Sequence, residues 1–204
     1  MALRHAVLAA LLDGEISGYQ LAKLFDITVS NYWHAQPPQL YTELSKLEAE
    51  GLVAGREVPQ QGRPNKRVYA PTSAGILELT EFITARGKPS YIRDDLLVKV
   101  QAADVAGTTS LVAQIEERAA EARAKIERFD QRLRRARDEL DEETYLASTP
   151  RIGPYLVGLR GKAFEQETLS WCEFSARILK ERTRSLNGPT VIEPTQPEEG
   201  SDDL

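Results

Sequence analysis

The chain of 204 residues has a single cysteine, Cys172, and only two histidines, His5 and His34. One cysteine excludes an intramolecular disulfide, which fits a reducing cytoplasm. Two isolated histidines without a paired His/Glu spacing argue against a metal site, so we expect neither a metal nor a cofactor. Cys172 lies in a helical pattern beside Trp171 and Phe174, which makes it a poor candidate nucleophile. We therefore expect a protein that is not an enzyme.

Long apolar runs are also missing, because no run approaches the roughly 20 residues that a membrane span requires. The apolar part of the opening segment, MALRHAVLAALLDGE, is too short for a signal peptide and lacks a small-residue cleavage site, so we interpret it as a helix. We expect a cytoplasmic protein with no membrane contact. The net charge of −5 argues only weakly against nucleic acid, because a local basic cluster can still bind phosphates.

The first 85 residues combine short helical patterns with one hairpin. Three helices are predicted, the second of which is capped by Ser17 before GYQLAKLF. The third begins at Pro37 or Pro38, ends before Gly51 and has a buried stripe of Leu40, Leu44 and Leu47.

Two strand-like segments follow, LVAGREVP and KRVYAPT, and the segment QQGRPN between them has the residues of a turn. The segment TSAGILELTEFI then predicts a helix with Thr72 or Ser73 as its cap. The order of three helices, a strand, a turn, a strand and a helix is that of a winged helix-turn-helix with a two-stranded wing.

The remaining sequence is predominantly helical. Residues 86–107 contain one helical segment, and a long helix is predicted over residues 108–143. Its apolar residues step by four and three through nearly four heptads, as Ile115, Ala119, Ala122, Ile126, Phe129, Leu133, Ala136 and Leu140. A last helix runs from Pro154 to about Arg184.

We therefore predict a mainly α protein with long antiparallel helices in its second part. Residues 1–85 form the winged helix-turn-helix DNA-binding domain and residues 86–186 form a helical dimerisation domain. Residues 187–204 are rich in proline and acidic residues, and we expect a disordered tail there.

The segments LLDGEISGYQLAK, NYWHAQPPQLYTELSKLEAEGLV and GRPNKRVYAPTSAG resemble the winged-helix domain of the PadR family of bacterial transcriptional regulators. Residues 90–184 are similar in helix pattern and length to the C-terminal domain of a subgroup related to virulence-gene activators. The resemblance implies a DNA-binding regulator in which two long helices carry dimerisation, and it implies a response to ligand or stress for some members only.

The predicted third helix and the hairpin supply candidate DNA contacts. Glutamine can bond adenine, threonine can touch the thymine methyl group, and tyrosine, lysine and arginine can reach phosphate. The candidates are Gln39, Tyr41, Thr42 and Lys46 on the helix and Arg63, Lys66 and Arg67 on the hairpin. Alternative readings remain open, namely a packed ring for Tyr41, a solvated charge for Lys46 and a solubilising loop for the hairpin tip.

A homodimer would place two such domains on one pseudo-palindromic duplex. We expect the heptad seam, which is the apolar stripe from Ile115 to Leu140, to be its contact surface, because it is longer than the remaining chain can bury; the alternative is a helical hairpin within one chain. The candidate interface residues are Ile115, Ala119, Ala122, Ile126, Phe129, Leu133, Leu159 and Trp171.

Aromatic residues near the predicted domain junction are candidates for a pocket that takes a small aromatic effector. They are Trp33, His34, Tyr155, Trp171 and Phe174, for which core and dimer packing is the alternative role. The sequence as a whole predicts a homodimeric transcriptional repressor that binds double-stranded DNA and is released by such an effector. The alternative is a protein–protein assembly module that uses the winged helix and a coiled coil without specific DNA binding.

Overall fold

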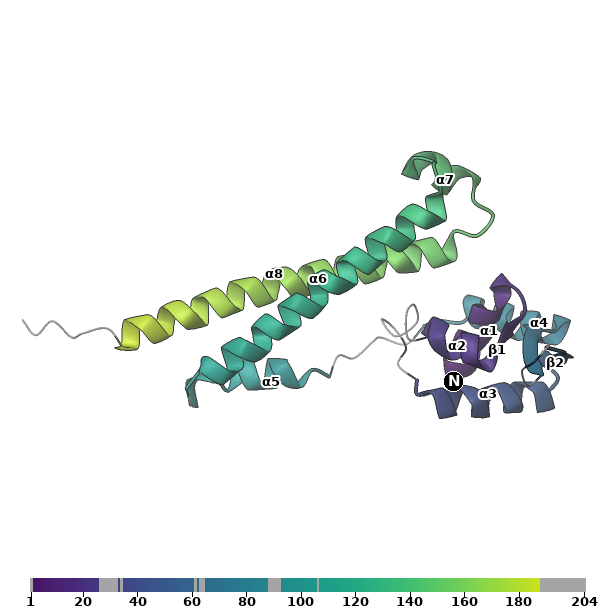
Figure 1. Ribbon diagram of the computed structural model, residues 1–204, viewed down its shortest axis with the longest axis horizontal. Coiled ribbons are helices and arrows are strands. Elements are labelled where there is room, and N and C mark those ends of the chain that lie inside the picture. Colours follow the sequence, from purple (N-terminus) through teal and green to yellow (C-terminus); the bar gives the residue numbers. More distant parts are fainter. Residues whose placement is uncertain are drawn as a thin grey trace, which may run out of the picture. The chain divides into compact units, whose positions relative to one another are not determined.

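A computed structural model describes residues 2–25, 33, 35–60, 62, 65–87, 93–105 and 107–187. The chain divides into two compact units, residues 1–91 and residues 92–204, which are coloured along the sequence in Figure 1. His34, Arg63 and residues 188–204 lie outside the described residues, and with them the predictions for the effector residue His34, the basic residue Arg63 and the tail.

Four α-helices and a 3₁₀ turn are described in the N-terminal unit, and local capping sets several of their ends. They are α1 (Ala2–Ala10), η1 (Leu11–Asp13), α2 (Gly18–Leu24), α3 (Pro37–Ala49) and α4 (Ser73–Thr84). The Ser17 hydroxyl accepts the Gln20 N–H at 3.3 Å, and the Gln20 side chain accepts the Ser17 N–H at 3.0 Å. Gly51 follows α3 with φ of 72°, and the Thr72 hydroxyl accepts the Gly75 N–H, so the predicted helix boundaries are confirmed here.

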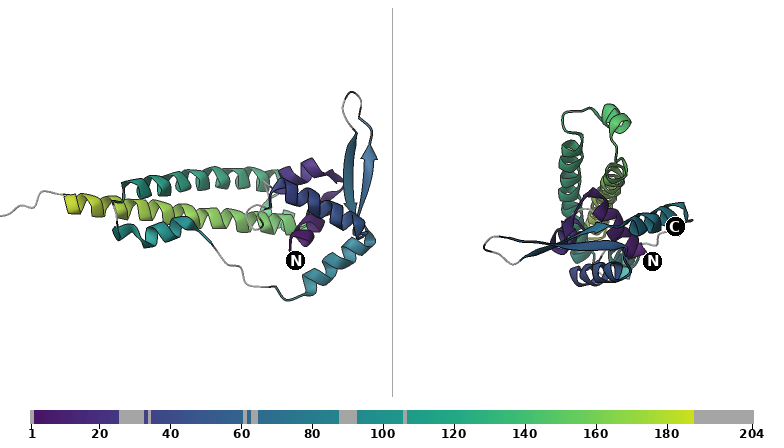
Figure 2. Two further views of the ribbon diagram at one scale, coloured as in Figure 1. Left: turned by 90° about the horizontal axis from the view of Figure 1, so that it is seen from below. Right: turned by 90° about the vertical axis from the view of Figure 1, so that its right-hand side faces the viewer.

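The two predicted strands form an antiparallel hairpin of β2 (Val53–Val58) and β3 (Lys66–Pro71), which Figure 2 shows beside the helices of its unit. A third strand, β1 (Ile16–Ser17), pairs with β3 on its other edge, with Ile16 opposite Tyr69. The sequence did not predict β1, because two residues are too few to show the alternation typical of a strand.

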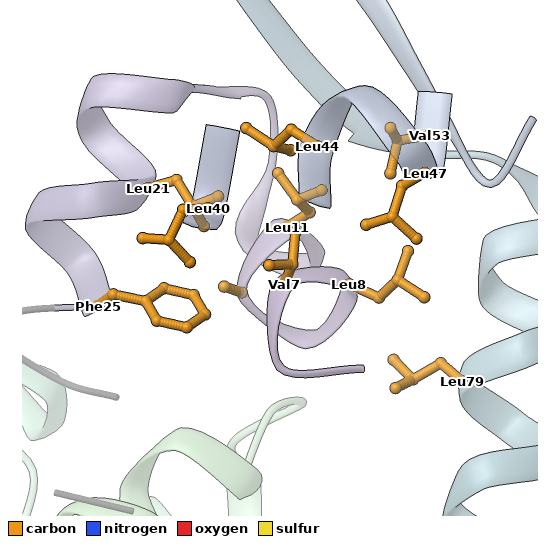
Figure 3. Packing of buried hydrophobic residues seen from close by; sticks show 11 residues of the cluster. Val7, Leu8, Leu11, Leu21, Phe25, Leu40, Leu44, Leu47, Val53 and Leu79 are labelled. Carbon is orange, nitrogen blue, oxygen red and sulfur yellow. The ribbon is translucent and has the colours of Figure 1, made fainter. Parts of the chain in front are cut away.

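The leucine stripe of α3 lies at the centre of the N-terminal core. Leu40, Leu44 and Leu47 are each at most 1 % exposed, as the spacing predicted. Figure 3 shows them among side chains from the other helices and β2, which include Val7, Leu8, Leu11, Leu21, Phe25, Val53 and Leu79. One face of α3 is thereby fixed to its own unit, and the opposite face is exposed.

The C-terminal unit contains two long helices and shorter segments. They are α5 (Asp95–Gln101), η3 (Ala103–Val105), α6 (Thr109–Arg137), α7 (Glu142–Ser148) and α8 (Gly153–Asn187). The helix expected over residues 108–143 ends at Asp138, which has φ of 54°, so Leu140 lies outside it. The short helix α7 was not predicted.

The two long helices, α6 and α8, run antiparallel and side by side, as Figure 2 shows. Two glycines of α8 allow this approach: a Cβ at Gly161 would lie 2.8 Å from Cε1 of Phe129, and one at Gly158 would lie 3.1 Å from Cδ2 of Leu133. Ion pairs join the helices at Lys125–Glu165 (2.9 Å) and Asp130–Lys162 (2.6 Å).

Packing within one chain covers most of the heptad seam. The side chains of Ile115, Ala119, Ala122, Phe129 and Leu133 are buried, whereas Ala136 and Leu140 are exposed. The premise that the rest of the chain is too short to bury the seam is therefore wrong, because α8 extends along α6. Within the described residues, no helix combines the length and the apolar character that crossing a membrane requires.

Candidate nucleic-acid interface

The outward face of α3 is polar and is fixed by the burial of the opposite face. The side chains of Thr42, Ser45 and Lys46 are exposed on it. The Thr42 hydroxyl donates to the Pro38 carbonyl at 2.9 Å, and the Ser45 hydroxyl donates to the Tyr41 carbonyl at 3.1 Å. Each hydroxyl proton is engaged within the helix, so the two oxygens are left as hydrogen-bond acceptors toward a ligand.

Gln39 is exposed in the first turn of α3, and its side chain also takes part in the helix cap. Its Oε1 accepts the Gln36 N–H at 2.8 Å. This bond occupies one of the two lone pairs of the amide oxygen and leaves the NH₂ group unused by the cap. Gln39 can therefore donate to a base or a phosphate without disturbing the helix start.

Tyr41 is 47 % exposed, and its ring lies against the start of α2. A Cβ at Gly18 would be 2.9 Å from Cδ1 of Tyr41, so only glycine leaves room for the ring in this position. The packing that the sequence left open for Tyr41 is therefore present, and the rest of its ring is accessible, so a DNA contact by Tyr41 stays a prediction.

The basic residues of the hairpin differ in their surroundings. Lys66 begins β3 and is half-buried, opposite Val58. Nη2 of Arg67 is 2.7 Å from Oε1 of Glu48, and this hydrogen bond raises the pKa of the Arg67 guanidinium. The guanidinium carbon also lies 5.9 Å from the centre of the Tyr69 ring. The Arg67 side chain therefore contacts α3 through Glu48 and is not an unpaired charge on the hairpin.

A further basic residue, Arg56 of β2, was missed by the sequence reasoning. It is exposed and forms an ion pair with Glu15, just before β1. Hydrogen bonding to Glu15 raises the pKa of Arg56 and lowers the pKa of Glu15. The only sequence signal for Arg56 was its place in a predicted strand, which does not identify a partner 41 residues away.

The proposed aromatic residues do not all line one pocket. The Tyr155 hydroxyl donates to Glu142 at 2.7 Å, and its ring lies 4.8 Å from that of Tyr145. Tyr155 and Trp171 are sixteen residues apart on α8, which is about 24 Å along a helix, so these two cannot share a small-molecule site. Trp33 packs against the N-terminal core, and Phe174 is 57 % exposed beside Arg177.

A shallow hollow of about 380 Å³ lies on the surface of α6 and α8. Small side chains line part of it, namely Ala119, Cys172 and Ala176, together with charged side chains such as Arg123 and Glu173. Cys172 is fully buried, and burial raises the pKa of its thiol, which disfavours the nucleophilic thiolate. Among the described residues, no cluster of three or more His, Cys, Asp or Glu side chains could hold a metal ion.

Comparison with known proteins gives two consecutive family matches. The model described as the transcriptional regulator PadR-like family matches residues 7–81, and the model described as virulence activator alpha C-term matches residues 92–180. A probable transcriptional regulator of Mycobacterium tuberculosis is 29 % identical over 196 residues, which is 89 % of this chain and all of that protein.

The negative transcriptional regulator PadR of Bacillus subtilis is 25 % identical over 172 residues, covering 84 % of this chain and 93 % of that protein. Its crystal structure in complex with operator DNA has a TM-score of 0.70 at 24 % identity and covers 88 % of this chain and 99 % of that one. A complex of the same protein with p-coumaric acid has a TM-score of 0.64 at 23 % identity and covers 88 % of this chain and 96 % of that one. These structures establish a shared fold.

Proposed function

The chain belongs to the PadR-like family of transcriptional regulators, with a C-terminal region of the virulence activator alpha type, and on this premise we propose that it binds specific double-stranded DNA to regulate transcription. The exposed polar face of α3, next to the hairpin that carries Lys66, is the observation that carries this proposal. A helix with one face buried and the other polar suits the major groove, and a basic hairpin suits the phosphate backbone.

The residues of α3 have different proposed roles. Thr42 and Ser45 present acceptor oxygens, and Thr42 also has a methyl group that suits thymine. Gln39 and Lys46 supply donors toward bases or phosphates, and Tyr41 supplies a phosphate contact at the side nearest α2. Sequence preference then depends on Thr42, Ser45 and Gln39, and general affinity depends on the cations.

A homodimer formed by the C-terminal unit is part of the proposal. The heptad residues are mostly used within the chain, so the contact surface would come from what α6 and α8 leave exposed. Apolar side chains on the outside of α8 support this, namely Leu156, Val157, Phe174 and Ile178. Ile126, Leu159 and Trp171 are partly exposed and remain candidate interface residues.

Repression and effector control are also proposed. The Bacillus subtilis relative is a negative regulator, and its structure with p-coumaric acid supports a planar aromatic effector here too. An effector would release DNA if it preferred an arrangement of the C-terminal helices that changes the spacing of the two DNA-binding units.

The proposal is tested by a mobility-shift titration on the DNA upstream of the chain's own gene, repeated across a series of salt concentrations. We expect affinity to fall steeply with salt, and we expect Lys66→Ala to weaken binding and to reduce the slope of log affinity against log salt by about one. Arg86→Ala removes the same charge from the end of the N-terminal unit and is the matched control. A salt-insensitive affinity would instead favour the protein–protein assembly module.

A further inference from the structure

A single carboxylate oxygen joins α3 to both strands of the hairpin. Oε1 of Glu48, in the last turn of α3, accepts the Gly55 N–H of β2 at 3.0 Å. The same oxygen accepts from Nη2 of Arg67 of β3 at 2.7 Å. One side chain of the helix that faces DNA therefore contacts the backbone of one strand and the side chain of the other.

Gly55 provides the space for this arrangement. A Cβ at this position would lie 2.8 Å from Nε of Arg67 and would be closer still to the carboxylate of Glu48. Any other residue would displace one of the two side chains. The Tyr69 ring, on the same face of β3, also helps to position the Arg67 guanidinium.

The ion pair between Glu48 and Arg67 contributes too little to folding stability for stability to be its main role. The side chains of Arg67 and Glu48 are 46 % and 31 % exposed, and ion pairs at such exposure contribute little to the free energy of unfolding. A carboxylate on a helix that faces phosphates also opposes DNA binding by simple charge repulsion. The geometry gives Glu48 another use, which is to hold the hairpin at one orientation relative to α3.

We propose that Glu48, Gly55 and Arg67 form a clasp that positions the hairpin for DNA binding, with Glu48 and Arg67 as positioning residues. This inference rests on the proposed function. It replaces the sequence-based prediction that Arg67 contacts DNA, because the cation is engaged by Glu48. Lys66, the neighbouring residue on the opposite face of the strand, keeps the role of a phosphate contact.

Charge and position predict opposite effects of Glu48→Ala. Removing a negative charge should strengthen DNA binding if only electrostatics matter, whereas loss of the clasp should weaken it by about threefold to fivefold per DNA-binding unit, because a partly exposed ion pair contributes at most about 1 kcal/mol. Glu48→Gln keeps an oxygen acceptor for Gly55 and Arg67 but loses the charge, so it should bind more tightly than Glu48→Ala. Glu43→Ala removes the same charge from the same helix and should not weaken binding.

A double-mutant cycle identifies the role of Arg67. If the clasp is the reason for its effect, Arg67→Ala weakens binding without lowering the salt slope, and the double variant with Glu48→Ala is no weaker than either single variant. Two results overturn the inference. One is wild-type or tighter binding by Glu48→Ala, and the other is a loss of about one in the salt slope for Arg67→Ala, which marks a phosphate contact.

Amide hydrogen exchange tests the clasp without DNA and separates its failure from failure of the proposed function. We expect a protected Gly55 amide in the wild-type chain and faster exchange at Gly55 in Glu48→Ala, with an unchanged circular dichroism spectrum. Equal Gly55 exchange in both proteins would overturn the clasp even if DNA binds. Faster exchange in a chain that binds no duplex would leave the clasp in place and refute the proposed function.

Discussion

The leucines of α3 and the residues on its outward face have different environments, and the environment determines what each substitution should do. Leu40, Leu44 and Leu47 are removed from water, so their contribution is to the free energy of unfolding. Thr42 and Lys46 are exposed, so the proposed function assigns them a contribution to DNA binding. This division makes it possible to separate stability from DNA affinity with changes in one helix.

Leu44→Ala should lower the free energy of unfolding of the N-terminal unit by about 2–5 kcal/mol, because it removes buried methyl groups and leaves a cavity. Urea denaturation of the full chain, followed by circular dichroism, should show a lower midpoint for that unit. Ser45→Ala is the matched control at the adjacent exposed position and should change stability by no more than about 0.5 kcal/mol. Equal midpoints for Leu44→Ala and the wild-type chain would contradict the packing.

The environment of the Tyr155 hydroxyl predicts that folding stability falls at alkaline pH. Burial, and then the hydrogen bond to Glu142, raise the pKa of Tyr155 to about 12 from 10.0. The unfolded chain releases this proton at lower pH than the folded chain, so the stability from the neutral phenol is complete below pH 10 and is lost between pH 10 and about 12. Tyr155→Phe should therefore show a smaller fall in melting temperature from pH 9 to pH 11, and an equal fall in both proteins would contradict this reasoning.

At the scale of helices and strands, local chemistry defined some boundaries and tertiary contacts defined others. The starts of α2, α3 and α4 followed from Ser17, Pro37 and Thr72. The end of α6 did not, because Asp138 adopts a left-handed conformation without a glycine or proline to mark it. The strand β1 depends on pairing with β3, which lies about 50 residues further along the chain.

In the candidate interface, too, some features follow from the local sequence and others depend on tertiary contacts. The outward face of α3 was predictable because its buried leucines leave only one exposed face. The partner of Arg67 was not, because the Glu48–Arg67 contact depends on how the hairpin folds back onto α3. A basic residue in a predicted strand therefore suggested a phosphate contact where the fold supplies a carboxylate.

Gly161→Ala tests the close packing of α6 against α8. Alanine is a better helix former than glycine by about 1 kcal/mol. Its methyl group would overlap the Phe129 ring, and overpacking costs about 1–3 kcal/mol, so we expect a net loss of stability. Gly153→Ala is the control because a Cβ there meets nothing within 4 Å. A higher melting temperature for Gly161→Ala than for the wild-type chain would contradict this helix contact.

At the scale of the whole molecule, the proposed activity requires two DNA-binding units on one duplex. A single winged helix contacts few bases, and a symmetric dimer doubles both the contacts and the sequence that is read. The net charge of −5 is compatible with this activity, because the cations proposed to contact DNA are local to α3 and the hairpin.

The proposed dimer can be tested at the exposed apolar side chains of α8. Phe174 and Ile178 are 57 % and 39 % exposed, and charged residues there would be incompatible with an apolar contact between two chains. Analytical ultracentrifugation at micromolar concentration should show a dimer for the wild-type chain and a shift toward monomer for the double variant Phe174→Glu, Ile178→Glu. A wild-type chain that sediments as a monomer would contradict the dimer.

The most direct measurement is a hydroxyl-radical footprint of the chain on the DNA upstream of its gene. Two chains with α3 in the major groove should protect two stretches, with centres separated by whole helical turns of about 10–10.5 base pairs, and Lys66→Ala should weaken both equally. A single protected stretch with one chain per duplex, or no protection even at low salt, would contradict the proposal that paired winged helices read one operator.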